Sequence, residues 1–322
     1  MPFSFAQIIH NHVVTNLKQT LEKLIEYYKR SQESLKMYNS KEYVFSKALN
    51  MIWQSFESEA WYEYLVENNI ENSKEAFSNC AKIDLEICSF NNSNIFEYKR
   101  DSPIYAILSD NLEVINSFAK VDYSIKTSPK KIKTHKELVK NGKSNIYIDT
   151  IIKSMNKDYS GLSNNLKTME STFLKLKKND LIKVDYDFFN GILNKNKDVI
   201  FESINTLVTK QHKKRNLKSS IYRDLVSQPA MGYAKIAWVN GFELEFDSPL
   251  IHNALLPFKP NNNYSEKVSI LKGNMTLKAI DPNYNGIKLT EELFNKMYPK
   301  EKTISENKFD SFWQKVKKKY NI

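Results

Sequence analysis

The chain has 322 residues, 41% of them hydrophobic and 12% aromatic, with 48 Lys and Arg against 37 Asp and Glu. This composition can build a large core and excludes a disordered polar chain, while seven glycines and nine prolines are too few for a turn-rich β-sandwich. We therefore expect an all-α fold of antiparallel helical hairpins, as a bundle or a short α-solenoid, that can include minor extended segments.

The net charge of +11 is distributed unevenly along the chain. Residues 1–100 contain 11 Lys and Arg against 13 Asp and Glu, so all of the positive excess follows residue 100. A basic surface can bind nucleic acid or steer an acidic partner. The chain is rich in Lys, Asn and Ile together, as an AT-rich coding sequence would make it. We therefore expect the lysines to form solvated faces rather than a nucleic-acid site.

Two cysteines, Cys80 and Cys88, fall on one predicted helix, about 12 Å apart along its axis. A disulfide cannot span that separation, so we expect free thiols and a reducing cytoplasm. The first residues lack a basic leader with a small-residue cleavage site, and no apolar run reaches the length of a membrane span. We expect neither export nor a membrane partner.

The first 100 residues are predicted to form an N-terminal helical region. Apolar residues at steps of three and four predict helices over residues 5–38, 41–67 and 74–88. The second helix also carries Tyr62 and four acidic residues that invite a carboxylate site. A solvated polar face explains them better; the acids are Glu57, Glu59, Glu63 and Glu67.

Residues 101–225 show a hint of internal repetition. The segment 107–115 aligns without gaps on 192–200, and 151–159 has the same outline with one extra residue. Each segment ends one helix, makes a polar turn and begins another, so it predicts either a stack of helical-hairpin repeats or a plain antiparallel bundle. Between these segments, the lysine-rich stretch 126–142 is predicted to be a linker or mobile loop.

Residues 226–322 contain the most distinctive stretch, although we expect the whole chain to form one continuous structural unit. A helix is predicted to follow Pro229, with Gly232 and a small-residue face of alanines that lets another backbone approach closely, and Gly241 is placed to end it at positive φ. An extended piece follows, and Asp247, Ser248 and Pro249 predict the start of another helix.

This stretch resembles the immunity protein 49 family of bacterial polymorphic toxin systems. The resemblance lies in Pro-Ala-x-Gly-Tyr-Ala-Lys-x-Ala-Trp, followed by Gly and by Asp-Ser-Pro-Leu-Ile and Leu-Leu-Pro, with a weaker match at 102–111. His252 departs from the family pattern, which has proline there. The residues that carry the resemblance are Pro229, Gly232, Tyr233, Ala234, Trp238, Gly241, Asp247, Ser248, Pro249, Pro257 and Tyr264. Tyr233 and Trp238 are expected in the core rather than at a contact surface.

No catalytic or metal-ligating pattern is convincing. The five histidines are not spaced as ligands, and the EF-hand-like run from Asp281 to Glu292 has Pro282 after its first ligand, which favours a turn leading into a helix over calcium binding. We expect no enzymatic activity and no cofactor. Shorter helices are predicted over residues 290–298 and 306–320.

The resemblance implies an all-α cytoplasmic protein that binds and neutralises a cognate toxin, and the sequence does not identify its partner-binding residues. An inhibitor that mimics nucleic acid should be acidic, so at +11 this chain would more readily meet an acidic surface, or use its slightly acidic residues 1–100. The alternative is a basic helical-repeat protein that binds nucleic acid through its lysine runs, with an affinity that falls steeply as salt is raised.

Overall fold

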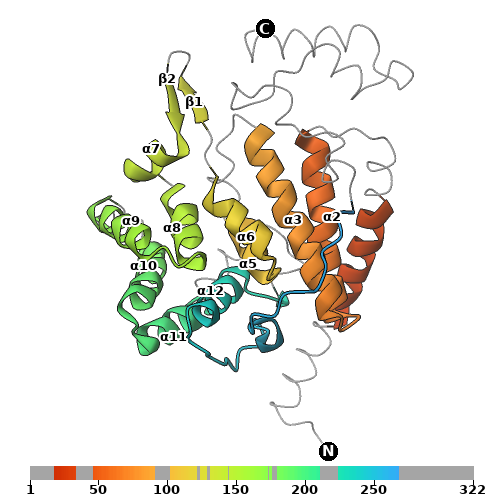
Figure 1. The fold of residues 1–322 in the computed structure, drawn as a ribbon. Coiled ribbons are helices and arrows are strands. Elements are labelled where there is room, and N and C mark those ends of the chain that lie inside the picture. The colour runs from red at the N-terminus through yellow and green to blue at the C-terminus, as the bar shows by residue number, and fades with distance from the viewer. Residues whose placement is uncertain are drawn as a thin grey trace, which may run out of the picture.

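In the computed structural model, the described residues are 18–33, 46–90, 102–121, 124–128, 131–143, 145–172, 174–175, 180–210 and 224–267. These residues are mostly helical and the helices pack against one another, which confirms the predicted all-α fold (Figure 1). Residues 18–33 lie within the first predicted helix and are helical. The EF-hand-like run and the helices predicted after it lie outside the described residues.

Antiparallel helical hairpins follow one another along the described chain. The α2–α3 hairpin packs on α5, α5–α6 packs on α8, and α8–α9 packs on α10 (Figure 1). Their bounds are α2 Ser46–Leu65, α3 Ile70–Phe90, α5 Ser102–Leu108, α6 Leu112–Ala119, α8 Asn145–Met155, α9 Tyr159–Thr172, α10 Asp180–Asn194 and α11 Lys197–Thr206.

The four hairpins share one turn. Its first residue has positive φ, between 54° and 58°, and the next residue is Asn or Asp, whose side chain accepts a hydrogen bond from a backbone N–H in the first turn of the following helix. The repetition seen in the sequence therefore corresponds to a repeated local geometry. The turn pairs are Asn68–Asn69, Asp110–Asn111, Lys157–Asp158 and Lys195–Asn196.

The stretch 126–142, predicted to be a linker or mobile loop, contains ordered elements instead. Strands β1 (Ser124–Ser128) and β2 (Lys131–Thr134) pair antiparallel, with Ser124 opposite Thr134, and helix α7 (His135–Lys140) follows directly. Thr134 and Glu137 form a capping box, because each side chain accepts a hydrogen bond from the other residue's backbone N–H. The prediction rested on electrostatic repulsion between the lysines and did not include the stabilisation of α7 by this capping box.

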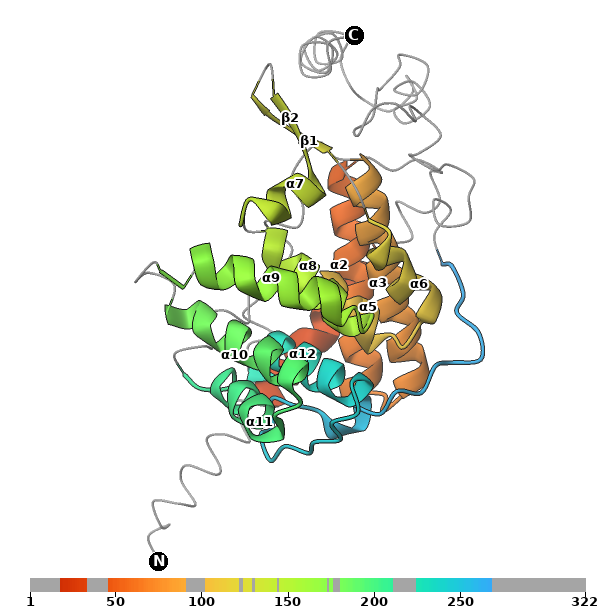
Figure 2. The same ribbon diagram turned by 60° about the vertical axis from the view of Figure 1, so that its left-hand side comes forward.

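Helix α12 (Gln228–Val239) packs on α5, α8 and α11, and in Figure 2 it lies below α8 and above α11. It ends as predicted at Gly241, whose φ is +90°. The N–H of Gly241 donates to the carbonyl of Trp238, and that of Phe242 donates to the carbonyl of Ala237. These two hydrogen bonds are the Schellman motif, which needs a residue at positive φ.

After Gly241 the chain is extended, with Leu244 and Phe246 buried and Glu243 and Glu245 exposed, as the alternating pattern predicts. The helix predicted at Asp247–Pro249 is wrong. Pro249 lies in a turn, and in the described residues that follow it, up to 267, the helical element is the short 3₁₀ helix η4 (Asn253–Leu255). The Asn253 side chain accepts a hydrogen bond from the N–H of Phe246 and donates one to its carbonyl, which fixes a loop in place of a helix.

Residues 253–267, which we call the strap, then run along α3 (Figure 2). Contacts mark the path in order: Asn261 donates to the carbonyl of Glu71, Asn79 donates to the carbonyl of Ser265, and Lys82 pairs with Glu266 at 2.8 Å. The strap, which is the last described segment of the chain, is thus bound to α3 of the first hairpin. The buried apolar residues from Leu24 to Leu256 form one continuous core.

Candidate functional site

The family-like residues of α12 make close contact with α5. Gly232 faces Ile104, and a Cβ at position 232 would lie 2.6 Å from Ile104 Cγ1, which is far inside normal contact distance. Ala230, Ala234 and Ala237 are fully buried on the same helix. The small-residue face of α12 therefore accommodates the Ile104 side chain of α5, and the expected close approach of another backbone stays a prediction.

Tyr233 is buried, in agreement with its expected place in the core. Its ring stacks on Phe188 with centroids 4.4 Å apart and meets Phe189 edge to face, and its hydroxyl donates a hydrogen bond to Asp185. Trp238 is half-buried and donates from Nε1 to the carbonyl of Leu244 at 2.7 Å. Tyr233 therefore contributes to packing, whereas Trp238 also reaches the surface.

A buried ion cluster lies between α12, the α5–α6 turn and α3. The Nζ of Lys235 is 2.6 Å from Oδ1 of Asp110, and neither side chain is exposed. Lys74 reaches Oδ2 of the same carboxylate at 2.7 Å and is itself only 5% exposed. Two ammonium groups thus share one carboxylate in the core, where unpaired charge is very unfavourable.

The strap supplies the remaining partners of this cluster. Lys235 donates to the carbonyls of Leu255 and Pro257 at 2.9 and 2.8 Å, and Lys74 donates to that of Lys259 at 2.7 Å. Burial lowers the pKa of Lys235 to about 8, although the charge of Asp110 opposes the shift. The cluster therefore couples the strap to the hairpins.

Tyr264 closes the strap over the same turn. Its hydroxyl donates to the carbonyl of Ser109 at 2.6 Å and accepts from the N–H of Asn261 at 3.0 Å. Asp247, Ser248 and Pro249 lie away from the cluster, exposed or half-buried, and Ser248 accepts a hydrogen bond from the N–H of Leu250. The structure thus brings the α12 residues together with Pro257 and Tyr264, but not with residues 247–249.

Two of the four acidic residues of the second predicted helix are buried, so the predicted solvated face is wrong for them. Glu57 accepts hydrogen bonds from Tyr105 and from Gln228, and Glu59 pairs with Lys267 of the strap at 2.6 Å. Their partners lie on distant elements, so helix periodicity could not reveal them. Glu67 is exposed, as expected.

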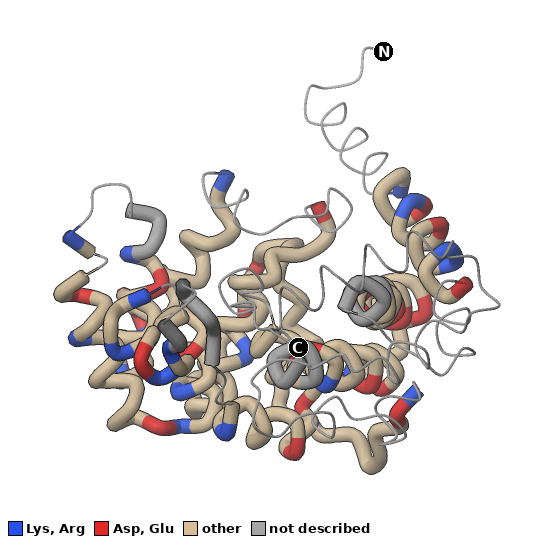
Figure 3. The backbone as a smooth tube through the Cα atoms, turned by 90° about the horizontal axis from the view of Figure 1, so that it is seen from above, with Lys and Arg blue, Asp and Glu red and all other residues tan. Residues whose placement is uncertain are grey.

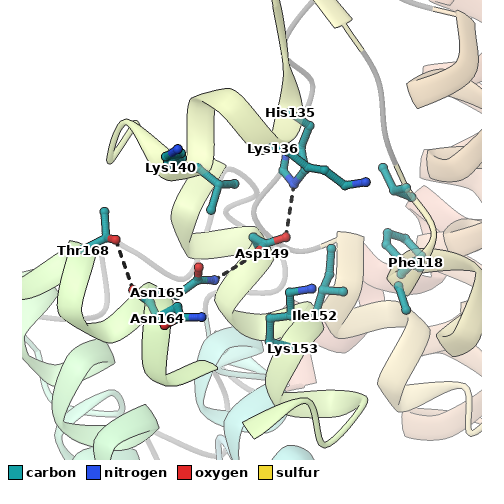
Figure 4. A pocket seen from close by; sticks show the side chains of 13 residues that line it. Phe118, His135, Lys136, Lys140, Asp149, Ile152, Lys153, Asn164, Asn165 and Thr168 are labelled. Atoms are coloured by element: carbon teal, nitrogen blue, oxygen red, sulfur yellow. Dashed lines mark hydrogen bonds and ion pairs between the residues drawn. The ribbon is translucent and has the colours of Figure 1, made fainter. Parts of the chain in front are cut away.

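A cavity of about 300 Å³ opens between α6, α7, α8 and α9, and we call it the α7 cavity (Figure 4). Apolar residues such as Phe118, Val139 and Ile152 contribute much of its wall, and lysines are added at its edge. Lys136 and Lys140 are exposed, and Lys153 pairs with Asp158 at 3.1 Å. In Figure 4 the side chain of Lys136 extends toward Phe118.

His135 and Asp149 form a pair inside the α7 cavity. His135 Nε2 lies 3.4 Å from Asp149 Oδ1, and Asn165 donates to Oδ2 at 2.8 Å (Figure 4). Burial alone would raise the pKa of Asp149, but the hydrogen bonds from His135 and Asn165 and the nearby positive charges lower it below its ordinary value. Asp149 is therefore ionised at neutral pH and orients both neighbours.

A second cavity of about 320 Å³ lies between α6, the end of α8, α12 and the strap, and we call it the α12 cavity. Its lining is mainly apolar and includes Trp238 of the family-like stretch. Leu112 and Phe258, which also line it, are 54% and 36% exposed. The α12 cavity is therefore a hollow whose wall includes solvent-exposed apolar side chains.

Among the described residues, no group of three or more His, Cys, Asp or Glu side chains is arranged to hold a metal ion. Within the same residues, no helix is both long and apolar enough to span a membrane. Comparison of the chain with models of known protein families, with curated proteins and with solved structures gave no match.

Sequence reasoning missed Asp110 and Lys74 as members of a buried cluster. One signal was present: in the alignment of the repeated turns, Asp110 occupies the position of Lys195. Both residues have positive φ, but Lys195 is exposed and Asp110 is fully buried. A change from a basic to an acidic residue at a repeated position marks the turn that the strap covers.

Proposed function

We propose that this chain is a cytoplasmic immunity protein that binds and neutralises a cognate bacterial toxin. The observation that carries the proposal is that residues of the family-like stretch have specific architectural tasks. Gly232 permits the contact with α5, Gly241 ends α12 at positive φ, and Lys235 and Tyr264 attach the strap. Because residues in the resembling stretch have these structural roles, the resemblance supports an architecture shared with the immunity protein 49 family.

Charge and redox features support the same proposal. Cys80 is a buried thiol that forms no disulfide and donates a hydrogen bond to the carbonyl of Trp53, which suits a reducing compartment. Lysines are interspersed with acidic residues along the described helices (Figure 3), a distribution that suits a protein partner with its own mixed charges. The overall excess of positive charge favours a partner surface that is acidic.

The test is co-expression with proteins encoded by neighbouring genes. A neighbouring protein that arrests growth when expressed alone, and no longer does so when this chain is present, is the expected result. The tagged chain should also capture that protein in a stoichiometric complex after nuclease treatment. Full toxicity of every neighbouring protein in the presence of the chain, with no complex, would contradict the proposal.

The alternative function, nucleic-acid binding, is favoured by the exposed Lys136, Lys140 and Lys143 around one short helix. Phosphate contacts release counterions, so the logarithm of the affinity for a duplex should fall linearly with the logarithm of salt concentration. Fluorescence anisotropy with a labelled DNA or RNA duplex measures this slope. A weak interaction without salt dependence would reject this alternative.

A further inference from the structure

We propose that the α7 and α12 cavities together form the docking surface for an acidic segment of the partner protein. An apolar side chain of that segment would enter the α12 cavity, and a carboxylate would lie at the lysines of the α7 cavity. This inference rests on the proposed function, because it names the surface and the chemistry through which the toxin is bound.

The two cavities are neighbours on the same pair of helices. On α6, Ile115 lines the α12 cavity and Phe118 lines the α7 cavity. On α8, Met155 lines the α12 cavity and Ile152 lines the α7 cavity. Each step is three residues, slightly less than one helical turn, or about 4.5 Å of rise. A few residues of one peptide segment can therefore occupy both cavities.

The apolar half of the surface is where accessible hydrophobic area is concentrated. In the described part of the chain the large hydrophobic residues that are exposed are Leu112, Tyr159 and Phe258. Leu112 and Phe258 line the α12 cavity, and Tyr159 lies beside it because its hydroxyl bonds Asn240 at the end of α12 at 2.9 Å. Exposed apolar residues gathered at one hollow mark an interaction site.

The charged half selects an acidic occupant. Lys136, Lys140 and Lys153 line the α7 cavity together with Asp149, whose carboxylate already accepts hydrogen bonds from within the protein. Lys153 pairs with Asp158 at 3.1 Å, so Lys136 and Lys140 supply the excess positive charge. Lys157 adds a further exposed cation at the α12 cavity. The local charge is therefore positive, and a carboxylate placed there gains favourable electrostatic energy in a partly desolvated site.

The apolar lining favours a peptide over nucleic acid. Ile107, Ile115, Met155 and Val239 form an aliphatic wall, which suits a branched or aromatic side chain. Tracking a phosphate backbone calls for cations along its path, whereas the carboxylates of Asp149 and Asp158 interrupt the lysines here.

The test compares variants that change each half of the surface at exposed positions. Lys136→Glu/Lys140→Glu reverses charge at the α7 cavity, Leu112→Asp places a carboxylate at the α12 cavity, and Lys167→Glu is the matched control. Lys167 is exposed on α9 and lines neither cavity. Thermal melting followed by circular dichroism checks that all variants fold.

The first probe is the inactive form of the neighbouring toxin identified by co-expression, measured by calorimetry. We expect the double variant and Leu112→Asp each to weaken binding by about tenfold or more, and Lys167→Glu to change it by less than about twofold. Wild-type affinity in both cavity variants would overturn the inference while leaving the immunity function intact.

If no neighbouring protein binds, the proposed function fails and a second probe decides the inference. This probe is a short synthetic peptide in which Leu and Asp alternate, with a Leu–Lys peptide as its counterpart. Selective binding of the acidic peptide, lost in both cavity variants, supports the docking surface. Equal binding of the two peptides, or binding of a nucleic-acid duplex that the same variants abolish, overturns it.

Discussion

Lys235 and Asp110 form an ion pair that is completely excluded from solvent, with Nζ and Oδ1 2.6 Å apart. One residue belongs to the helix of the family-like stretch and the other to the turn between α5 and α6. Asp110 also neutralises Lys74, so a single carboxylate balances two buried ammonium groups. Removing the Asp110 carboxylate and removing one of the two lysines should therefore lower the free energy of unfolding by different amounts.

We expect Asp110→Asn to lower the free energy of unfolding by about 3–5 kcal/mol, because it leaves two buried cations without their counter-ion. Lys235→Met should cost less, since Asp110 keeps its pairing with Lys74 and methionine fills most of the same volume. Urea denaturation of both variants measures the difference. Equal losses would show that Asp110 is not the shared counter-ion.

The ion cluster should also produce a pH dependence. Burial lowers the pKa of Lys235 to about 8 in the folded protein, from 10.5 for an ordinary lysine. Between these values the unfolded state binds the proton and the folded state releases it, so the contribution of this group to the free energy of unfolding rises with pH.

The measurable quantity is the difference in free energy of unfolding between wild type and Lys235→Met. It should increase in favour of wild type from pH 8 to pH 10.5, because the other titrating groups are common to both proteins. Urea denaturation at several pH values in this range measures it. A difference that is constant or falls with pH would refute the assigned shift.

The contact between Gly232 and Ile104 predicts that Gly232→Ala destabilises the fold by about 1–3 kcal/mol, because the new methyl group overlaps the Ile104 side chain. Ile104→Ala removes that side chain beyond Cβ. The double variant should therefore be more stable than the sum of the two single losses implies. Additive losses would mean that overlap with the Ile104 side chain is not the reason why a methyl group at position 232 destabilises the fold.

The repeated turn offers a matched pair of substitutions. Lys195 and Asp110 have φ values of 54° and 57°, where a side chain is strained and glycine is not. Lys195→Gly should raise the free energy of unfolding by up to about 1 kcal/mol, whereas Asp110→Gly should lower it, because the loss of the buried counter-ion outweighs the relief of strain. Thermal melting of the two variants tests this contrast.

The parts of the structure that the sequence predicted depend on local signals. Periodic apolar residues indicated the helices, and Gly241 marked the end of α12 because positive φ strongly favours glycine. The capping box of Thr134 and Glu137 was also a local signal, but the lysines around it dominated the interpretation.

The parts that could not be predicted depend on distant partners. Asp247, Ser248 and Pro249 resemble a helix start, yet the amide of Asn253 pairs with the backbone of Phe246 and fixes a loop. Glu57 is buried because Tyr105 and Gln228 hydrogen-bond to it from other helices. The two cavities likewise arise from the packing of several elements, and none of the sequence patterns marks them.

The strap imposes an order on folding. Lys74 lies in the first described hairpin, yet its carbonyl partner is Lys259, and Lys267 is the partner of Glu59 and Glu75. These contacts close very long loops, whose entropic cost is met only after the intervening hairpins have packed. During synthesis Lys74 can pair with Asp110 as soon as the next hairpin forms, whereas Glu59 and Glu75 meet their partner Lys267 only after nearly the whole described chain has left the ribosome.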